Sequence, residues 1–423
     1  MRSAAGLADV RADLDRLRTR LDTMVGTADG TRPAIPAPRL SRAGEAGEGE
    51  SLLPLGGKPE GLSGPDAPVV RGRSAQGTAK AIGWGLELPT LGRRRFRGES
   101  GSVLADVGRG PLAVGDLDAR HPAAKVSVLW RADLADELAW RYEYESCAWG
   151  YAGLRWLVVD RGGAARAGEQ PSVERPSEGS VGPGDVDRLR AATSQAAEVA
   201  RRLGDQPARQ ALVGYLGTEA DRLLRASSRG PVNRELLSAT AEATLLAGCL
   251  TYASWPLAAL AQAYFVQALA LAQACRDRPL GAAVLCAMSQ QAVFNGHLDE
   301  ARKLVGTAIS GTGGATIPGL SAHIRLLTAR DHLHRNELSS CVRTLKDAVT
   351  EFDRARPGGR PGWTRWFTDA DPLLFALVLG AAYLAAGLAE PARDTQLVAQ
   401  RLADRTQTPC SARYVSELET SLP

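Results

Sequence analysis

The side chains that could bind a metal ion come close together in the sequence only at His323, His332, His334 and Cys341. A zinc site needs several such side chains that converge on one point. Successive residues of a helix are rotated by about 100°, so His332 and His334 would point about 200° apart and could not bind the same ion. We therefore interpret these histidines as surface or helix-cap residues and expect no metal site.

The sequence also lacks the patterns of nucleotide binding and nucleophilic catalysis. The glycine run GTGGA at 311–315 has neither the Lys-Ser/Thr pair that follows a phosphate-binding loop nor the buried strand that precedes one. We expect it to be a loop between two helix hairpins. The chain has no serine nucleophile turn, no His-Glu-x-x-His pair and no paired carboxylates in an apolar setting. The sequence therefore predicts a protein that is not an enzyme and has no cofactor.

A basic cluster is the main chemical signal in the N-terminal part of the chain. Thr90 is followed by the densest group of cations in the sequence, Arg93, Arg94, Arg95 and Arg97. In a helix that begins after Thr90, several guanidinium groups could reach DNA phosphates together while the threonine contacts the DNA backbone. These five residues are the predicted DNA contacts. The alternative is a solvated basic run, because the formal net charge of +4 does not by itself indicate nucleic-acid binding.

Aromatic side chains form a second candidate binding site. Trp363, Trp366 and Phe367 lie in an insert rich in proline and glycine, RPGGRPGWTRWFTDAD. If the insert exposes them, they could form a platform for a partner. Aromatic residues can equally close the end of a helical repeat from inside. The sequence leaves both alternatives open.

The composition favours a helical protein of the cytoplasm. Aromatic residues are 5% of the chain, and alanine and leucine fill its second half. Two uncharged stretches, 245–275 and 373–389, are interrupted by proline and glutamine or are short, so we expect buried helices and no membrane span.

No pair of cysteines has a metal or redox spacing, which predicts reduced core thiols at Cys147, Cys249, Cys275, Cys286, Cys341 and Cys410.

An apolar seam marks the N-terminus. Apolar residues recur at spacings of three and four over 7–24, namely Leu7, Val10, Leu14, Leu17, Leu21 and Met24. This pattern predicts an amphipathic helix over 1–25. Asp13 and Arg18 fall where a parallel partner helix could pair with them, so a homodimer is one option. We favour the alternative, in which the helix docks on its own chain.

Breaker residues and helical periodicity divide the rest of the chain. Glycine, proline and serine are dense in two stretches that we expect to be linkers, while apolar residues at helical spacing fill the others. The resulting segments are a mostly disordered linker at 26–102, a helical segment at 103–159, a second linker at 160–184, and helical repeats at 185–420 that begin at a helix capped by Asp185.

The repeats are visible as a register in which a breaker is followed by a small residue five positions later and by another after seven more. Three units recur every forty residues: Pro256/Ala261/Ala268, Gly296/Ala301/Ala308 and Asn336/Cys341/Ala348. A fourth unit, Gly387/Ala392/Ala399, is displaced by the aromatic insert. The breaker ends the first helix of a hairpin, and the small residues let neighbouring helices approach. We predict an all-α fold, a tetratricopeptide-like helical-repeat array with a largely disordered N-terminal region. The alternative is an irregular helical bundle.

Several blocks of sequence resemble one group of proteins. The blocks are LWRADL (129–134), LRWLV (154–158), AQAYFVQAL and RPLGAAVL within 245–304, and WTRWFTDAD (363–371). They are similar to actinobacterial regulatory proteins in which a degenerate N-terminal helix-turn-helix precedes tetratricopeptide-like helices, and which are implicated in differentiation and secondary metabolism. The resemblance implies a degraded helix-turn-helix remnant at 78–98, in which TLGRRRFRG (90–98) corresponds to the recognition helix, and therefore implies DNA binding.

The leading hypothesis from the sequence is therefore a cytoplasmic transcriptional regulatory protein. Its repeat array would hold a protein or peptide partner in the repeat groove, or sense a signal, and its N-terminal module would act on DNA. The alternative is a protein-interaction scaffold of the tetratricopeptide type that does not bind DNA.

Overall fold

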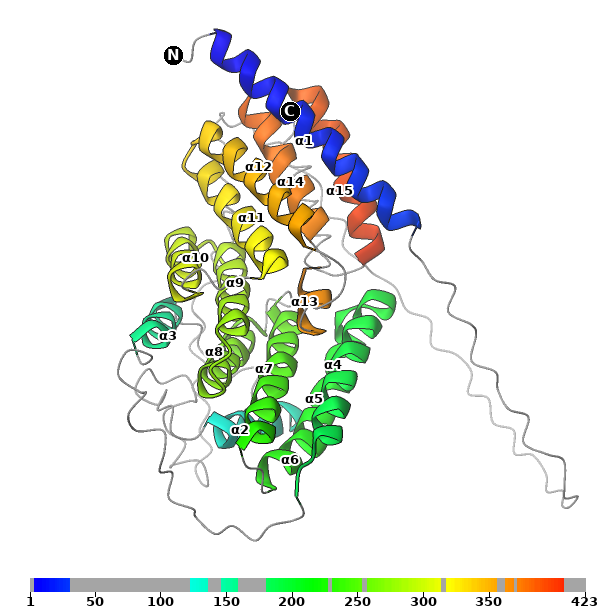
Figure 1. Cartoon of the computed structure of the whole chain (residues 1–423), viewed down its shortest axis with the longest axis vertical. Coiled ribbons are helices and arrows are strands. Elements are labelled where there is room, and N and C mark those ends of the chain that lie inside the picture. The colour runs from blue at the N-terminus through cyan, green and yellow to red at the C-terminus, as the bar shows by residue number, and fades with distance from the viewer. Residues whose placement is uncertain are drawn as a thin grey trace, which may run out of the picture.

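The structure is a computed structural model that describes residues 4–30, 122–135, 146–158, 180–226, 230–252, 257–312, 317–355, 362–368 and 371–406 (Figure 1). Within these residues the chain is helical, with turns between helices and no strand beyond a single bridge residue. The predicted all-α class is confirmed. The predicted linkers lie almost entirely outside the described residues, as does the first part of the predicted helical segment, 103–121.

Helices from residue 183 onward pack as antiparallel pairs. The pairs are α4 (Pro183–Leu203) with α5 (Asp205–Tyr215), α7 (Gly230–Tyr252) with α8 (Ala258–Ala274), α9 (Arg278–Phe294) with α10 (Leu298–Thr312), α11 (Pro318–His334) with α12 (Leu338–Arg354), and α14 (Asp371–Ala385) with α15 (Ala389–Thr406). The first helix of each later pair also packs against both helices of the pair before it. This stacking is that of tetratricopeptide-like repeats, so the predicted repeat array is confirmed.

The turns within the pairs explain the predicted breakers. Gly296, Asn336 and Gly387 have φ values of 80°, 59° and 77°, the left-handed conformation that ends a helix. In each turn the amide after the breaker donates to a carbonyl five residues earlier, at 2.8 to 2.9 Å. The fourth breaker, Pro256, lies outside the described residues. The repeated geometry shows that these turns are one structural element used several times.

The small residues of the register lie on the second helices, where the pairs are in contact. All are 4% exposed or less: Ala261 and Ala268 on α8, Ala301 and Ala308 on α10, Cys341 and Ala348 on α12, and Ala392 and Ala399 on α15. A larger side chain at these positions would hold the first and second helices apart. The forty-residue register therefore identified the contact face of each second helix.

Short elements interrupt the regular stacking. A π-helix, η4 (Leu216–Ala220), and the short α6 (Asp221–Arg225) extend α5, and α13 (Gly362–Phe367) lies between α12 and α14. Both α13 and α15 contact α4, so the two ends of the array meet (Figure 1).

The first helix of the array begins slightly before the predicted cap. Gly182 is the N-cap of α4 and Pro183 its first residue, while the Asp185 carboxylate accepts a hydrogen bond from the Gly182 amide at 2.9 Å. Asp185 therefore stabilises the helix from its first turn and is not the cap itself.

The two uncharged stretches fold into α7, α8 and α14, whose residues are largely buried. Among the described helices, none combines the length and apolar character needed to cross a membrane.

Candidate functional site

Three helices that precede the array in sequence lie against its second helices (Figure 1). We call the grooves between the second helices of consecutive pairs the outer grooves. α2 (Pro122–Leu134) contacts α5, η4, α6 and α8, and α3 (Ser146–Val158) contacts α8, α9 and α10. α1 (Ala4–Gly30) contacts α12 and α14 and reaches α15 through a hydrogen bond. The array thus holds helices of its own chain in three outer grooves.

A buried ion pair fixes α2 in its groove. The Asp133 carboxylate accepts hydrogen bonds from Nη2 of Arg209 on α5, at 2.6 and 2.8 Å, and from the Tyr264 hydroxyl on α8. Nε of Arg209 donates to Thr251 Oγ1 on α7 at 3.0 Å. Both charged side chains are 10% exposed or less, so losing one partner would leave the other charge buried and unpaired. This network joins α2 to consecutive helix pairs.

A tryptophan in a slot between glycines fixes α3. The Trp156 ring is 1% exposed and packs against Gly281 on α9 and Gly311 on α10. A Cβ atom would lie 2.5 Å from the ring at position 281 and 1.8 Å from it at position 311, so only glycine leaves room for the indole. The Arg278 guanidinium lies 4.6 Å from the ring centre and donates to the Trp156 carbonyl at 3.2 Å. α3 is therefore held by contacts of Trp156 with both α9 and α10.

Leucines hold α1 in the third groove. Leu14, Leu17 and Leu21 are at most 4% exposed, so the predicted seam is buried. In the structure these leucines pack within the chain, against α12 and α14, which is the arrangement of the favoured alternative.

Polar contacts line the rim of the α1 groove. The carboxylate of Asp13 pairs with Lys346 at 3.1 Å, and that of Asp15 accepts from the Tyr383 hydroxyl at 3.1 Å. Arg18 donates to Thr395 Oγ1 at 2.8 Å. Arg20 on α1 also pairs with Asp353 on α12. Burial and the nearby Asp15 raise the pKa of Tyr383, which keeps its hydroxyl protonated and able to donate.

The predicted aromatic site lies on α13. Trp363 and Phe367 are 1% and 8% exposed and pack edge to face, with ring centres 5.9 Å apart. The expectation of an exposed platform is therefore not met by these two side chains, because the protein itself covers them and they close the repeat from inside. Trp366 belongs to the same helix, and its side chain lies outside the described atoms.

Beside α13 lies a buried histidine that the sequence had assigned to the surface. His323 on α11 is 3% exposed, its ring centre lies 4.9 Å from that of Phe367, and Nδ1 lies 2.5 Å from Oδ1 of Asp371 on α14. Its Nε2 lies 2.9 Å from Nε2 of Gln290 on α9. The Gln290 side-chain nitrogen donates, so Nε2 of His323 accepts and Nδ1 carries the proton toward Asp371. Both ring nitrogens are engaged, and the imidazole connects three first helices.

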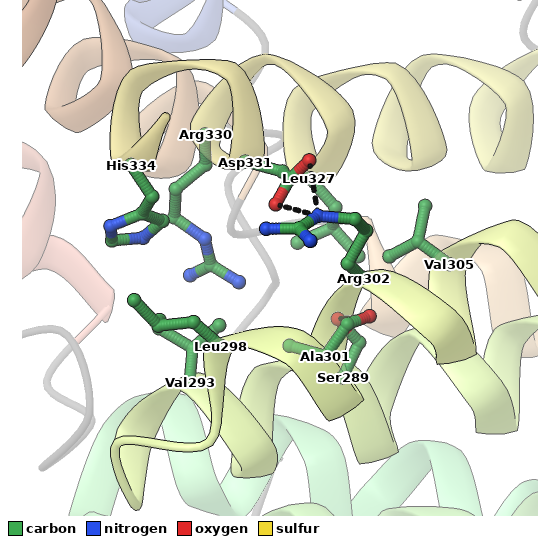
Figure 2. A pocket seen from close by; sticks show the side chains of 10 residues that line it. All are labelled: Ser289, Val293, Leu298, Ala301, Arg302, Val305, Leu327, Arg330, Asp331 and His334. Carbon is green, nitrogen blue, oxygen red and sulfur yellow. Dashed lines mark hydrogen bonds and ion pairs between the residues drawn. The ribbon is translucent and has the colours of Figure 1, made fainter. Parts of the chain in front are cut away.

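The other histidines that the structure describes do not converge on a metal site. His332 pairs with Glu337 at 2.8 Å. No group of three metal-binding side chains occurs in the part of the chain that the structure describes. Figure 2 shows His334 at the edge of a small pocket between the α9–α10 turn and α11.

The pocket is lined by basic and apolar side chains. Nε of Arg302 donates to both carboxylate oxygens of Asp331, at 2.9 and 3.1 Å, and Arg330 is 3% exposed (Figure 2). Burial lowers the pKa of His334 to about 4, so its ring is neutral at pH 7. The remaining walls come from Ser289, Val293, Leu298, Ala301, Val305 and Leu327. The ion pair joins α10 to α11, and the pocket is a gap in that junction.

The predicted DNA contacts are not brought into this framework. Thr90, Arg93, Arg94, Arg95 and Arg97 all lie outside the described residues.

Comparisons with known proteins add little to this geometry. No family model and no curated protein matches the chain. A similar solved structure contains the nearly identical tetratricopeptide-like repeats of a candidate kinesin light chain from Podosopora anserina. The two chains are 17% identical, the match covers 52% of this chain and 97% of that one, and the TM-score is 0.31. The repeat assignment therefore rests on the helix pairs themselves.

Sequence reasoning found α2 and α3 as helical blocks but not their grooves. One available signal was glycine inside a helical pattern, which marks a close approach. Gly311 was assigned to a loop, yet α10 continues through Thr312 and places this glycine beneath Trp156. Gly281 gives the same signal in the first turn of α9.

Proposed function

We propose that this protein is a protein-interaction scaffold whose repeat array binds amphipathic helices in its outer grooves. The observation that carries the proposal is that α1, α2 and α3 each occupy such a groove. Stacked helix pairs leave these grooves at regular intervals, and an amphipathic helix fits into one through its apolar face. The array binds helices of its own chain by side chains that would serve equally for a partner.

The contacts inside the chain indicate what a partner helix must carry. Binding energy at protein interfaces concentrates in a few buried aromatic, arginine or aliphatic anchors. Here the anchors are Trp156 in its glycine slot, Asp133 in its arginine pair, and the leucines of α1. A partner therefore needs one central anchor of this kind and a polar rim that matches the groove.

Peptide selection on the intact chain tests this function. A library of displayed helical peptides is selected on the immobilised full-length protein, and the protected segments are mapped by hydrogen exchange with the bound peptide. We expect enriched peptides with apolar residues at i, i+3 or i+4, and i+7, and protection on second helices such as α8, α10, α12 and α15. The proposal fails if no such pattern is enriched, or if protection is confined to first helices.

A second candidate function is transcriptional regulation, in which the array still binds a partner and the N-terminal region also binds DNA. It is supported by the basic cluster of Thr90 and the arginines that follow it, and by the resemblance to actinobacterial regulators with an N-terminal helix-turn-helix. In this proposal the N-terminal module contacts DNA phosphates and the array receives the partner or the signal.

Mobility shifts at two salt concentrations test the DNA contact. Neutralising four phosphates predicts a log-log salt slope of about −3.6, and replacing Arg93, Arg94, Arg95 and Arg97 with alanine should remove most binding and flatten that slope. A matched control removes four exposed arginines of the array, Arg188, Arg202, Arg222 and Arg354. Equal behaviour of the wild type and the cluster variant would leave only the scaffold function.

The cysteines support the proposal that the protein acts in the cytoplasm. Cys275, Cys286 and Cys341 are buried, Cys249 is partly buried, and none of these four cysteines is disulfide-bonded. Burial raises the pKa of Cys275 and of Cys341 to about 12, so both stay protonated and unreactive at neutral pH.

A further inference from the structure

We infer that the groove of α12, α14 and α15 is an exchangeable site, in which an amphipathic helix of a partner protein replaces α1. The inference rests on the proposed scaffold function and names the groove, the occupant and its chemistry. It follows from how differently the three helices of the chain are held.

α1 is held by contacts of a different kind from those of α2 and α3. α2 has a buried ion pair in contact with several helices, and α3 has a tryptophan enclosed between glycines. α1 has an apolar seam and polar pairs at the rim, where Arg20 and Asp353 are 38% and 52% exposed and Lys346 is 51% exposed. Exposed ion pairs contribute little to stability, so the leucines provide most of the binding energy.

α1 is also separated from the rest of the fold by the longest stretch of sequence. Residues 31–121 join it to α2, and the sequence predicts that most of this stretch is linker. A helix on so long a tether competes for its groove at an effective concentration below that given by a short flexible linker, which is on the order of a millimolar. A partner helix must therefore bind more tightly than α1 or be present at high local concentration. α1 thus lowers the apparent affinity of the groove for a partner helix.

The charges around the leucines of α1 indicate which charges a replacing helix needs, and the acidic ones surround Leu14. Leu14 is flanked by Asp13, which meets Lys346, and by Asp15, which meets the Tyr383 hydroxyl. A replacing helix needs carboxylates at these two places, because they face a cation and a hydroxyl donor that would otherwise lose a partner.

The basic residues of α1 follow in the next turn of the helix. Arg18 and Arg20 reach Thr395 and Asp353, on either side of the seam that Leu17 and Leu21 continue. The expected occupant is a helix with leucines at i, i+3 and i+7, acidic around the first leucine and basic after the second. It lies in the same direction as α1.

The experiment uses the full-length chain with a protease site inserted within residues 31–121, before and after cleavage. The probe is a fluorescein-labelled peptide of residues 1–30, and binding is measured by fluorescence anisotropy. Cleavage releases α1 from its tether, so we expect the cleaved protein to bind the probe at least tenfold more tightly than the intact protein does. Equal binding before and after cleavage, or none in either state, overturns the inference.

Matched peptides test the groove and the charge pattern. Leu17→Asp should weaken binding at least tenfold, whereas Thr19→Asp, which adds the same charge at an exposed position, should not. An alanine-based helix carrying only the leucines of the seam and the four charged residues should compete with the probe, and its charge-inverted form should compete at least tenfold less well. If Leu17→Asp binds like Thr19→Asp, or if the alanine-based helix does not compete, the inference is wrong. Peptides selected in the other outer grooves would still support the scaffold function.

Discussion

Replacing Gly311 with alanine tests how the array holds α3. The new Cβ would lie 1.8 Å from Cζ3 and 2.3 Å from Cη2 of Trp156. The indole is rigid and 1% exposed, and its Nε1 edge lies 2.5 Å from the Cβ position of Gly281. The ring has no free space into which it can move, so the substitution must displace the tryptophan or separate α3 from α10.

The expected cost follows from these two outcomes. Overpacking a close-packed site costs about 1–3 kcal/mol, and losing a buried tryptophan altogether costs about 3–5 kcal/mol. We expect Gly311→Ala to lower the free energy of unfolding by about 2–3 kcal/mol. Gly306 lies on the same helix, and a Cβ there would meet no atom within 4 Å. Gly306→Ala should therefore stabilise the protein by about 0.5–1 kcal/mol, the usual gain of alanine over glycine in a helix.

Urea denaturation followed by circular dichroism measures both free energies of unfolding. A double-mutant cycle then assigns the effect to the indole, because Gly311→Ala should lose most of its cost in a Trp156→Leu background. The explanation is refuted if Gly311→Ala and Gly306→Ala have the same effect, or if the full cost persists when the tryptophan is absent.

Three further substitutions test other parts of the structure. Asp133→Asn leaves Arg209 buried without its counter-charge and should destabilise the protein by about 3 kcal/mol in urea denaturation, whereas the exposed Asp187→Asn should change it by less than about 0.5 kcal/mol. Burial raises the pKa of Asp205 to about 7, so its stabilising contribution is present below about pH 4 and is lost as the pH rises through about 7. Asp205→Asn should therefore match the wild type at pH 4 and exceed its stability by about 4 kcal/mol at pH 8; a difference that does not vary with pH would contradict this. If α13 contacts a partner through Trp366, then Trp366→Ala should weaken capture of selected peptides without changing the melting temperature, and unchanged capture would exclude that contact.

Local sequence features were sufficient to predict the array. A helix-ending residue followed at fixed distances by two small residues is a short-range pattern, and Gly296, Ala301 and Ala308 show it within one hairpin. Since each pair contacts mainly its neighbours, the same pattern recurs wherever a pair occurs. The N-terminal seam was likewise predictable as a helix, because its leucines share one face.

The groove contacts could not be predicted, because they join residues far apart in the chain. Trp156 meets Gly311, and Asp133 meets Arg209, through stacking that must exist before either pair can form. Similarly, the surface assignment of His323 failed because its partner, Asp371, begins a helix that follows an insert of irregular length. Buried polar pairs of this kind have no periodic signature in the sequence.

The positions of α1, α2 and α3 give the array two differently stabilised parts. α2 and α3 cover the outer grooves up to α10, α1 covers the last one, and none of the three occupies the groove between α10 and α12 in the described chain. Across this boundary the ion pair of Arg302 with Asp331, at 2.9 Å, joins α10 to α11. Partly exposed pairs weaken as salt rises, whereas the leucine and tryptophan contacts at either side do not. A partner that replaces α1 would therefore bind the part of the array that a partly exposed ion pair joins to α10.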